Sequence, residues 1–235
     1  MNIPFEKIIP FCEDFITLDS DKKSQLTKYA ELLVEWNEKI NLTAITEPEE
    51  IAVKHFLDCI MIFKYVDISQ NSSVIDIGTG AGFPGLVMKI VRPDINLTLL
   101  DSLNKRITFL DTVCSELSLK NVTTIHSRAE DGAVKLREKY DYAVARAVAN
   151  MPVLCEYCIP YVKLGGSFVA MKGASAKQEA EQSVNAVKIL GGQIISTDLF
   201  NIENCGDRGI ISIKKISQTP TKYPRNPAKI SKQPL

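Results

Sequence analysis

The residues best suited to chemistry form a glycine-rich turn behind a short apolar run. Residues 74–77 are apolar except for Asp76, and the sequence Gly78-Thr79-Gly80-Ala81-Gly82 follows them directly. Glycine tolerates positive φ and has no Cβ, so alternating glycines let the chain turn sharply and let a ligand approach the backbone. A strand-to-helix turn that binds nothing is the alternative, and the acid ahead of three glycines disfavours it. The turn therefore predicts a nucleotide-like ligand.

Two classes of ligand use such a turn. A dinucleotide fold places an acid about 20 residues further on, and Asp101 lies at roughly that distance, where it could accept ribose hydroxyls in either class. Asp76, two residues before the first glycine, favours S-adenosylmethionine, as does the absence of a helix between the last two expected strands. A dehydrogenase remains an alternative, but the sequence shows neither its acid–base residue nor its substrate domain.

The elements that must position this turn alternate along most of the chain. Strand-like runs are expected at residues 73–77, 96–101, 122–126, 141–148 and 167–171, each followed by a helical pattern, at 85–92, 104–118, 130–139, 152–163 and 175–190. Gly165-Gly166 and Gly191-Gly192 are expected where helices stop. The final strand-like runs, 193–200 and 209–216, leave no room for a helix between them and should be antiparallel. The pattern predicts an α/β fold, a Rossmann-like class I methyltransferase with a seven-stranded, mostly parallel sheet and an antiparallel last strand.

A helical segment is expected ahead of the sheet. Residues 20–41 carry apolar side chains at helical spacing. A second helix should begin near Thr46, which forms a capping box with Glu49, and should end before Asp67. We therefore expect three parts: a helical segment (1–65), an S-adenosylmethionine-binding domain (66–216) and a basic, proline-rich tail (217–235).

Charge is distributed unevenly along the chain. Lysine and arginine total 28, as do aspartate and glutamate, yet residues 214–235 hold six bases and no acid, which leaves 22 bases against 28 acids elsewhere. A basic tail on an acidic body suggests a polyanionic partner. A solvated, partly disordered terminus is an equally good interpretation, and the four prolines of the tail argue against regular structure there.

Composition indicates a cytoplasmic protein without a metal. No apolar run reaches the roughly 18 residues of a membrane span, and the N-terminus lacks the basic and apolar blocks of a signal peptide. Most of the six cysteines lie in apolar stretches and are expected to pack as small hydrophobic residues. Cys155 and Cys158 form one C-x-x-C, but the second pair of ligands that a zinc site needs is missing.

With these motifs placed, the chain resembles the RsmG family, also called GidB, which methylates N7 of guanine 527 in bacterial 16S ribosomal RNA. The resemblance runs from about Tyr29 to the last residue. Eight motifs carry it, in this order: Asn41-Leu42-Thr43; His55-Phe56-Leu57-Asp58; residues 76–85; Asp101-Ser102 with Lys105-Arg106 and Phe109-Leu110; Arg128-Ala129-Glu130; Ala145-Arg146-Ala147; Met171-Lys172-Gly173; and Tyr223-Pro224-Arg225.

The resemblance implies a set of cofactor contacts. The residues expected to touch S-adenosylmethionine are Gly78, Phe83, Ala129, Glu130 and Arg146, with Asp101 on the ribose. Gly78 would let the backbone approach the methionine end, and Ala129-Glu130 lies past a strand end, where the adenine should sit. Core packing is an equally good interpretation of Phe83. A surface salt bridge is the alternative for Arg146, although its place near a strand's carboxyl end favours the ligand.

The resemblance also implies a substrate, 16S ribosomal RNA within the small subunit or its precursor. The sequence does not give the oligomeric state, and a monomer is the default expectation. Guanine N7 carries a free lone pair, so we expect no catalytic base, only positioning and desolvation. Arg146 and Lys172 are candidates to hold guanine O6 or a phosphate, and a plain surface lysine is an equally good interpretation of Lys172. Tyr223 and Arg225 in the tail could stack on a base or track phosphates.

Two other functions are compatible with parts of the sequence. The first is a methyltransferase acting on a small molecule, against which the basic tail and Lys105-Arg106 argue. The second is a non-enzymatic RNA-binding module, against which the intact glycine turn and Asp101 argue.

Overall fold

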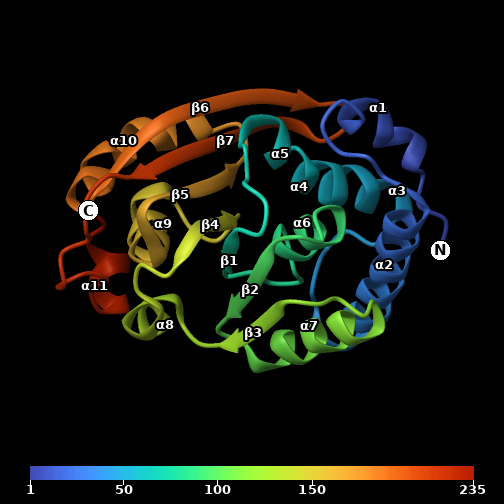
Figure 1. The fold of residues 1–235 in the computed structure, drawn as a ribbon, viewed down its shortest axis with the longest axis horizontal. Coiled ribbons are helices and arrows are strands. Elements are labelled where there is room, and N and C mark those ends of the chain that lie inside the picture. Colours follow the sequence, from blue (N-terminus) through green and yellow to red (C-terminus); the bar gives the residue numbers. More distant parts are fainter.

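One twisted sheet of seven strands crosses the molecule and carries helices on both faces (Figure 1). The computed structural model describes residues 1–235. The strand order is β3-β2-β1-β4-β5-β7-β6. Strands β1 to β5 pair in parallel, and β7 runs antiparallel to both β5 and β6. The predicted fold class is confirmed. The strands are β1 (Ser73–Ile77), β2 (Asn96–Asp101), β3 (Val122–His126), β4 (Tyr140–Arg146), β5 (Val162–Lys172), β6 (Gly192–Ile202) and β7 (Gly206–Lys215).

The helices between the strands follow the expected order. They are α6 (Gly85–Val91), α7 (Asn104–Glu116), α8 (Ala129–Leu136), α9 (Met151–Cys158) and α10 (Ala176–Ile189). Successive residues of a strand point to opposite faces, so Val74 joins the core under α6 and α7, whereas Ile75 joins the core under α8, α9 and α10. Both faces of β1 are therefore buried, which accounts for its nearly continuous apolar sequence.

The N-terminal helices pack on the same core as α6 and α7. They are α1 (Ile9–Cys12), α2 (Ser20–Ile40), α3 (Pro48–Glu50), the π-helix η2 (Ile51–Leu57), α4 (Asp58–Ile60) and α5 (Ile62–Tyr65), after a short turn η1 (Phe5–Lys7). Tyr29 of α2 is fully buried and donates its hydroxyl to the carbonyl of Ala81 in the glycine turn. The helical segment thus contacts the turn directly.

Two local predictions are wrong. The expected capping box is absent, because the second helical stretch begins at Pro48 with Glu47 as N-cap and no side-chain cap bond. Gly165-Gly166 lie inside β5 and not at a helix end, since α9 already stops at Cys158 and a short 3-10 turn, η3 (Ile159–Tyr161), follows. A Cβ on Gly166 would lie 2.5 Å from the carbonyl oxygen of Asp141 in β4. Close approach between neighbouring strands, and not helix termination, explains that glycine.

The proline-rich tail is also more regular than expected. It ends in a short helix, α11 (Pro227–Lys232), which lies beside α8 and α9 (Figure 1). Proline suits the first turn of a helix, and the side chain of Asn226 caps α11 by accepting from the backbone N–H of Lys229.

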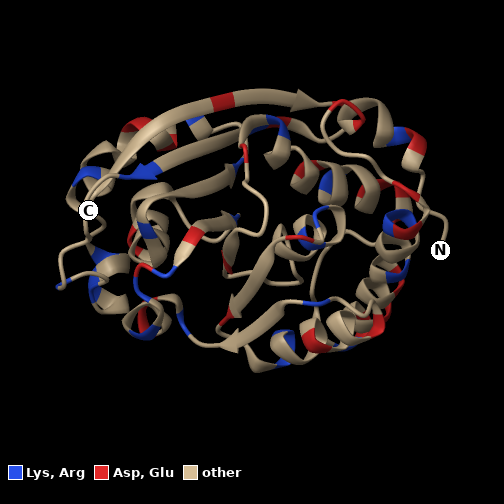
Figure 2. Ribbon diagram, in the orientation of Figure 1, with Lys and Arg blue, Asp and Glu red and all other residues tan.

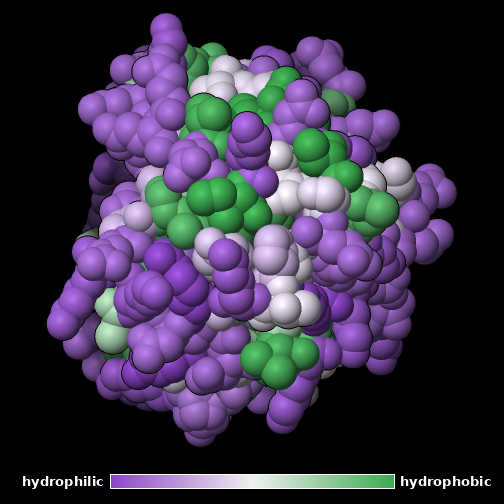
Figure 3. Space-filling view, turned by 90° about the vertical axis from the view of Figure 1, so that its left-hand side faces the viewer, coloured by the Kyte–Doolittle hydropathy of each residue, from purple (hydrophilic) through white to green (hydrophobic).

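The two cysteines of the C-x-x-C motif pack in the core as expected. Cys155 and Cys158 are fully buried. No helix has the length and apolarity needed to span a membrane. The side of the molecule that carries the tail shows apolar patches scattered among hydrophilic side chains (Figure 3), an ordinary surface pattern.

Candidate functional site

The glycine turn is held by hydrogen bonds from β1 and β2. The backbone N–H groups of Gly78 and Thr79 both donate to the carbonyl of Leu100, at 2.8 and 3.1 Å. Asp76 accepts the Thr79 hydroxyl at 2.6 Å and the Gly85 N–H at 2.8 Å. Burial raises the pKa of Asp76 to about 6. Asp76 therefore shapes the turn from beneath and does not face a ligand.

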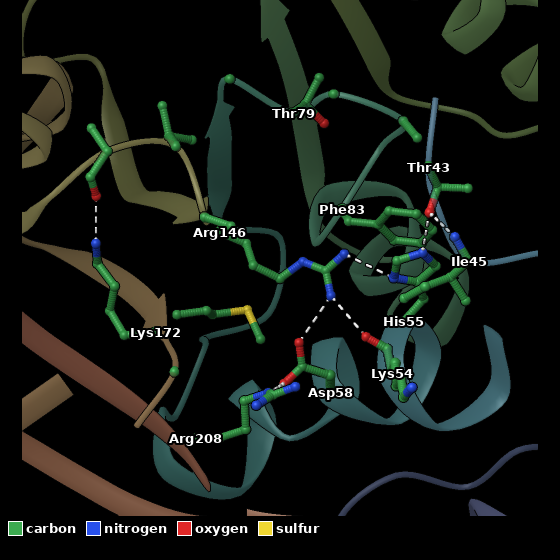
Figure 4. Close-up of a pocket in the computed structure, with 18 of the residues that line it drawn as sticks. Thr43, Ile45, Lys54, His55, Asp58, Thr79, Phe83, Arg146, Lys172 and Arg208 are labelled. Carbon is green, nitrogen blue, oxygen red and sulfur yellow. Dashed lines mark hydrogen bonds and ion pairs between the residues drawn. The ribbon is translucent and has the colours of Figure 1, made fainter. Parts of the chain in front are cut away.

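Two cavities open where the parallel strands end, and they share Gly78 and Val148. The large cavity, about 810 Å³, is the one drawn in Figure 4. The small cavity holds about 280 Å³. Gly78 has φ +69°, and a Cβ there would lie 2.9 Å from Cγ2 of Val148. Any side chain at position 78 would fill the junction between the cavities.

The small cavity lies past the ends of β2 and β3. Its lining includes Ser102, Arg128, Ala129, Glu130 and Tyr157. Ala129 accepts the hydroxyl of Tyr161 at 2.6 Å through its carbonyl, while Glu130 is nearly buried. The structure thus brings together Gly78, Ala129 and Glu130, three of the predicted cofactor contacts.

Asp101 lies between the glycine turn and α7 and outside the lining of either cavity. Its carboxylate accepts the N–H of Gly80 and of Leu103, both at 2.9 Å. Arg106 adds an ion pair at 3.3 Å. Oδ2 therefore accepts from two groups and Oδ1 from one, so Oδ1 retains a lone pair that a ribose hydroxyl could use.

Arg146 is the central side chain of the large cavity (Figure 4). Its Nη1 donates to Asp58 Oδ2 at 2.9 Å and to the carbonyl of Lys54 at 3.1 Å. Nη2 contacts Nδ1 of His55 at 3.1 Å, and the guanidinium carbon lies 4.9 Å from the centre of the Phe83 ring. Nε donates to no acceptor within the protein, which leaves one edge of the guanidinium free.

His55 is held in one protonation state by its two partners. Arginine can only donate, so Nδ1 of His55 must accept from Arg146 and the proton must sit on Nε2. That nitrogen lies 3.0 Å from Oγ1 of Thr43. Burial, together with the charge of Arg146, lowers the pKa of His55 to about 3. The ring is neutral near pH 7 and stacks on Phe83, with centroids 4.3 Å apart.

Asp58 is shared between two arginines from different parts of the sheet. Besides Arg146 it pairs with Arg208 of β7, at 3.3 Å. His55 and Asp58 come from the π-helix η2 and from the start of α4. Short π-helical segments occur frequently at functional sites. The His55–Asp58 motif thus fixes the guanidinium of Arg146 from two sides.

Lys172 also lines the large cavity, at the end of β5. Its ammonium pairs with Glu179 at 2.7 Å and donates to the carbonyl of Ala149. Hydrogen bonds and the positive charge of Lys172 keep the pKa of Glu179 below its usual value, although burial opposes this. Lys172 is therefore a buried, paired cation and not a plain surface lysine.

The two tail residues predicted to contact RNA lie elsewhere. Tyr223 is only 7% exposed and packs in the core under α9. Arg225 makes a double contact with Glu156, its Nε and Nη2 lying 2.7–3.1 Å from the two carboxylate oxygens. In this arrangement the Tyr223 ring is buried, and Nε and Nη2 of Arg225 are bound to Glu156.

Sequence reasoning assigned no role to several residues of the large cavity. They are Thr43, His55, Asp58, Glu179 and Arg208. A usable signal existed for two of them, because His55 and Asp58 are polar, lie one helical turn apart and, with Lys54, are the only polar residues of the apolar stretch 51–63.

Comparison with known proteins places this geometry in context. The family model GidB, described as rRNA small subunit methyltransferase G, matches residues 22–206. The curated protein "Ribosomal RNA small subunit methyltransferase G" of Clostridium beijerinckii is 54% identical over 94% of this chain and 93% of its own length. The protein of the same name from Clostridium botulinum is 52% identical over 95% of each chain.

Solved structures show the same fold at low sequence identity. A 16S rRNA (adenine(1408)-N(1))-methyltransferase from Catenulisporales acidiphilia has a TM-score of 0.54 and 14% identity, covering 65% of this chain and 88% of its own. Precorrin-6y C5,15-methyltransferase from Geobacter metallireducens has a TM-score of 0.53 and 15% identity, covering 73% and 90%.

Proposed function

Because the chain belongs to the GidB family, rRNA small subunit methyltransferase G, we propose that it transfers a methyl group from S-adenosylmethionine to N7 of a guanine in 16S ribosomal RNA, the guanine at position 527. The observation that carries this proposal is the pair of cavities that meet at Gly78. A donor in the small cavity and a base in the large one would face each other across that glycine.

The residues of the junction fit S-adenosylmethionine. A Cβ on Gly78 would fill the space beside Val148, so the backbone there is bare where a ligand would pass. Ala129 and Glu130 would hold the adenine edge, and Asp101 would hold the ribose through the remaining lone pair of Oδ1. When bound, S-adenosylmethionine supplies a methyl group activated by the positive charge of its sulfonium.

The chain's own residues act by positioning and by excluding water. Guanine N7 has a free lone pair, so no residue is needed to remove a proton. Arg146 offers the Nε–H of its free edge to a carbonyl such as guanine O6, while Asp58 and His55 keep the guanidinium in place. Phe83, only 6% exposed, gives that edge an apolar neighbour. Positioning of this kind can supply roughly 7–11 kcal/mol.

Lys172 serves a second acceptor, a phosphate or a base carbonyl, by exchanging the carbonyl of Ala149. Glu179 keeps this ammonium inside the cavity until the exchange occurs. The RNA is presented within the small subunit or its precursor, and the protein works as a monomer in the cytoplasm.

A labelling experiment tests the proposed function. The protein is incubated with methyl-labelled S-adenosylmethionine and, separately, small ribosomal subunits, naked 16S RNA and free guanosine, all lacking the modification. We expect label in 16S RNA, from one or both RNA substrates, and none in the nucleoside. Label in the nucleoside alone, or in protein alone, would contradict the proposal.

A further inference from the structure

The tail from Thr219 to Lys232, named here the C-terminal strap, is fastened to the body at several points. Arg137, directly after α8, donates to the carbonyls of Thr219, Pro220 and Tyr223. The N–H of Thr219 donates to Glu138 at 2.9 Å. Because these contacts hold the backbone itself, the strap starts from a fixed position beside α8.

An ion pair between Arg225 and Glu156 also holds the strap on the body. Glu156 lies on α9 and is fully buried. Its carboxylate accepts the backbone N–H of Arg225 at 2.7 Å in addition to the guanidinium. A buried carboxylate needs a partner, and Arg225 is its only ion pair in the structure. This ion pair, named here the Arg225–Glu156 clasp, therefore holds the strap on α9.

The clasp places α11 against the small cavity. Pro227, the first residue of α11, lines that cavity together with Ala129, Glu130 and Tyr157. Ile230, one turn further on, is fully buried and holds the inner face of α11 to the body. Tyr157 lies on α9, next to Glu156, so clasp and cavity wall belong to the same helix.

The bases of the strap that remain exposed lie on its outer side. Lys229 and Lys232 of α11 are exposed, and Figure 2 shows basic residues along this part of the chain. They do not line the small cavity. The strap thus has an inner side that faces the cavity and an outer side that carries the charge.

We propose that the C-terminal strap is a wall of the cofactor site, with Pro227 closing the adenosine end of the small cavity and the Arg225–Glu156 clasp keeping it closed. This inference rests on the proposed function, since it takes the small cavity as the adenosine site. Arg225 and Glu156 are positioning residues, and Pro227 is the residue that contacts the ligand. The Tyr223-Pro224-Arg225 motif then serves binding of the nucleoside part of the cofactor and not the tracking of RNA.

The dissociation constants of S-adenosylmethionine and S-adenosylhomocysteine, measured by calorimetry on the full chain, test the strap. Pro227→Trp should weaken both ligands by about tenfold or more, about 1.4 kcal/mol, without lowering the melting temperature, because the first helical position tolerates the change and the indole would occupy the cavity. Arg225→Ala should weaken both ligands and also lower the melting temperature. Arg225→Lys, which keeps the charge and loses the double contact, should fall between Arg225→Ala and the unmodified protein.

A matched control separates the inner side of the strap from the outer one. Lys229→Ala lies on the same helix as Pro227 and should leave the affinity for both ligands unchanged. If the folded Pro227→Trp and Arg225→Ala proteins bind both ligands as tightly as the unmodified protein, the strap is not a wall of the site and the inference is wrong. If the unmodified protein binds neither ligand, the proposed function itself fails. The two failures are therefore distinguishable.

Discussion

The two cavities that meet at Gly78 are built from different chemistry. The large one is lined by cations from separate elements, among them Arg146, Lys172 and Arg208, each paired with a carboxylate. The small one is lined by strand ends, the ring of Tyr157 and the buried Glu130, and its one cation, Arg128, is largely exposed. The cationic cavity suits a base and its phosphates, and the other suits a flat nucleoside. Two substrates of one reaction could thus be bound by different chemistry and still meet at a single glycine.

Two arginines sharpen this comparison. Arg146 and Arg225 both contact a carboxylate that is less than a tenth exposed. Both leave one guanidinium nitrogen without an acceptor, Nε in Arg146 and Nη1 in Arg225, but Arg146 lines a cavity and Arg225 lines neither cavity. A buried ion pair is therefore not by itself a sign of a site. An unpaired N–H that lines a cavity is the informative feature.

The largest effect is expected from a side chain at the junction. Gly78→Val should reduce the affinity for S-adenosylmethionine by more than about 100-fold, about 2.7 kcal/mol, because φ is +69° and the new Cβ would lie 2.9 Å from Val148. Calorimetric titration measures the loss. Gly78→Ala combined with Val148→Ala should bind better than Gly78→Ala alone, since the second change removes the clash. Equal affinities would mean that Val148 does not limit the junction.

Asp76, buried beneath the junction, should make the free energy of unfolding depend on pH. Burial raises the folded-state pKa of Asp76 from 3.8 to about 6, so the folded protein binds more protons than the unfolded chain between these values. The contribution of Asp76 to the free energy of unfolding is therefore fully present below about pH 4. It is lost as pH rises through 6, which lowers the free energy of unfolding by up to about 3 kcal/mol. Denaturant unfolding at several pH values measures this fall. Asp76→Asn should remove it, and an unchanged pH profile would show that Asp76 is not its source.

Methyl transfer should depend on the hydrogen-bonding geometry of Arg146 in the cationic cavity and not only on its charge. Arg146→Lys keeps the charge but cannot reach Asp58, the carbonyl of Lys54 and His55 together. We expect kcat to fall by about 100-fold. Single-turnover methyl transfer to 16S RNA is the measurement. Full activity of Arg146→Lys would mean that a positive charge alone is enough.

A smaller effect is expected from the residue that orients Arg146. His55→Phe keeps the stack on Phe83 but loses the contacts with Arg146 and Thr43, and kcat should fall by about tenfold, about 1.4 kcal/mol. His55→Gln, which can still accept and donate, should recover part of the loss. Because the pKa of His55 lies at about 3, His55 should not change its charge near pH 6.5. The pH profiles of the unmodified and the His55→Gln proteins should therefore have the same shape around that pH, without an inflection in the unmodified protein alone. Such an inflection would mean that His55 titrates during the reaction.

Local sequence signals were enough for the sheet and for the glycine turn. The predicted bounds of β1, β2 and β3 coincide with the observed ones. Apolar runs define the buried strands β1 and β2, and β-branched residues between turn residues define the partly exposed edge strand β3. Gly165-Gly166 misled for the opposite reason. Their need for glycine comes from Asp141 in the neighbouring strand, a contact that no local pattern reveals.

The site residues also differ in whether their role depends on neighbours in the chain or on residues far away in the sequence. Gly78 was predicted from its neighbours in the chain, whereas the partner that gives His55 its role, Arg146, lies 91 residues away. The tail shows the same limit of local reasoning. Its charge suggested an RNA contact, but the carboxylate that binds Arg225 is Glu156, buried on a helix 69 residues earlier. Charge counted along a sequence cannot show which charges are already paired inside the fold.

The site of methylation on the RNA tests the central claim most directly. The positively charged ring of N7-methylguanine, unlike that of guanines methylated at other positions, is reduced by borohydride. Aniline then cleaves the RNA chain at that nucleotide, and primer extension locates the break. We expect one new break, at a single guanine of 16S RNA, that requires both S-adenosylmethionine and the protein and is absent with the Gly78→Val protein. Methyl label in the RNA without such a break, or label on another base, would contradict the account.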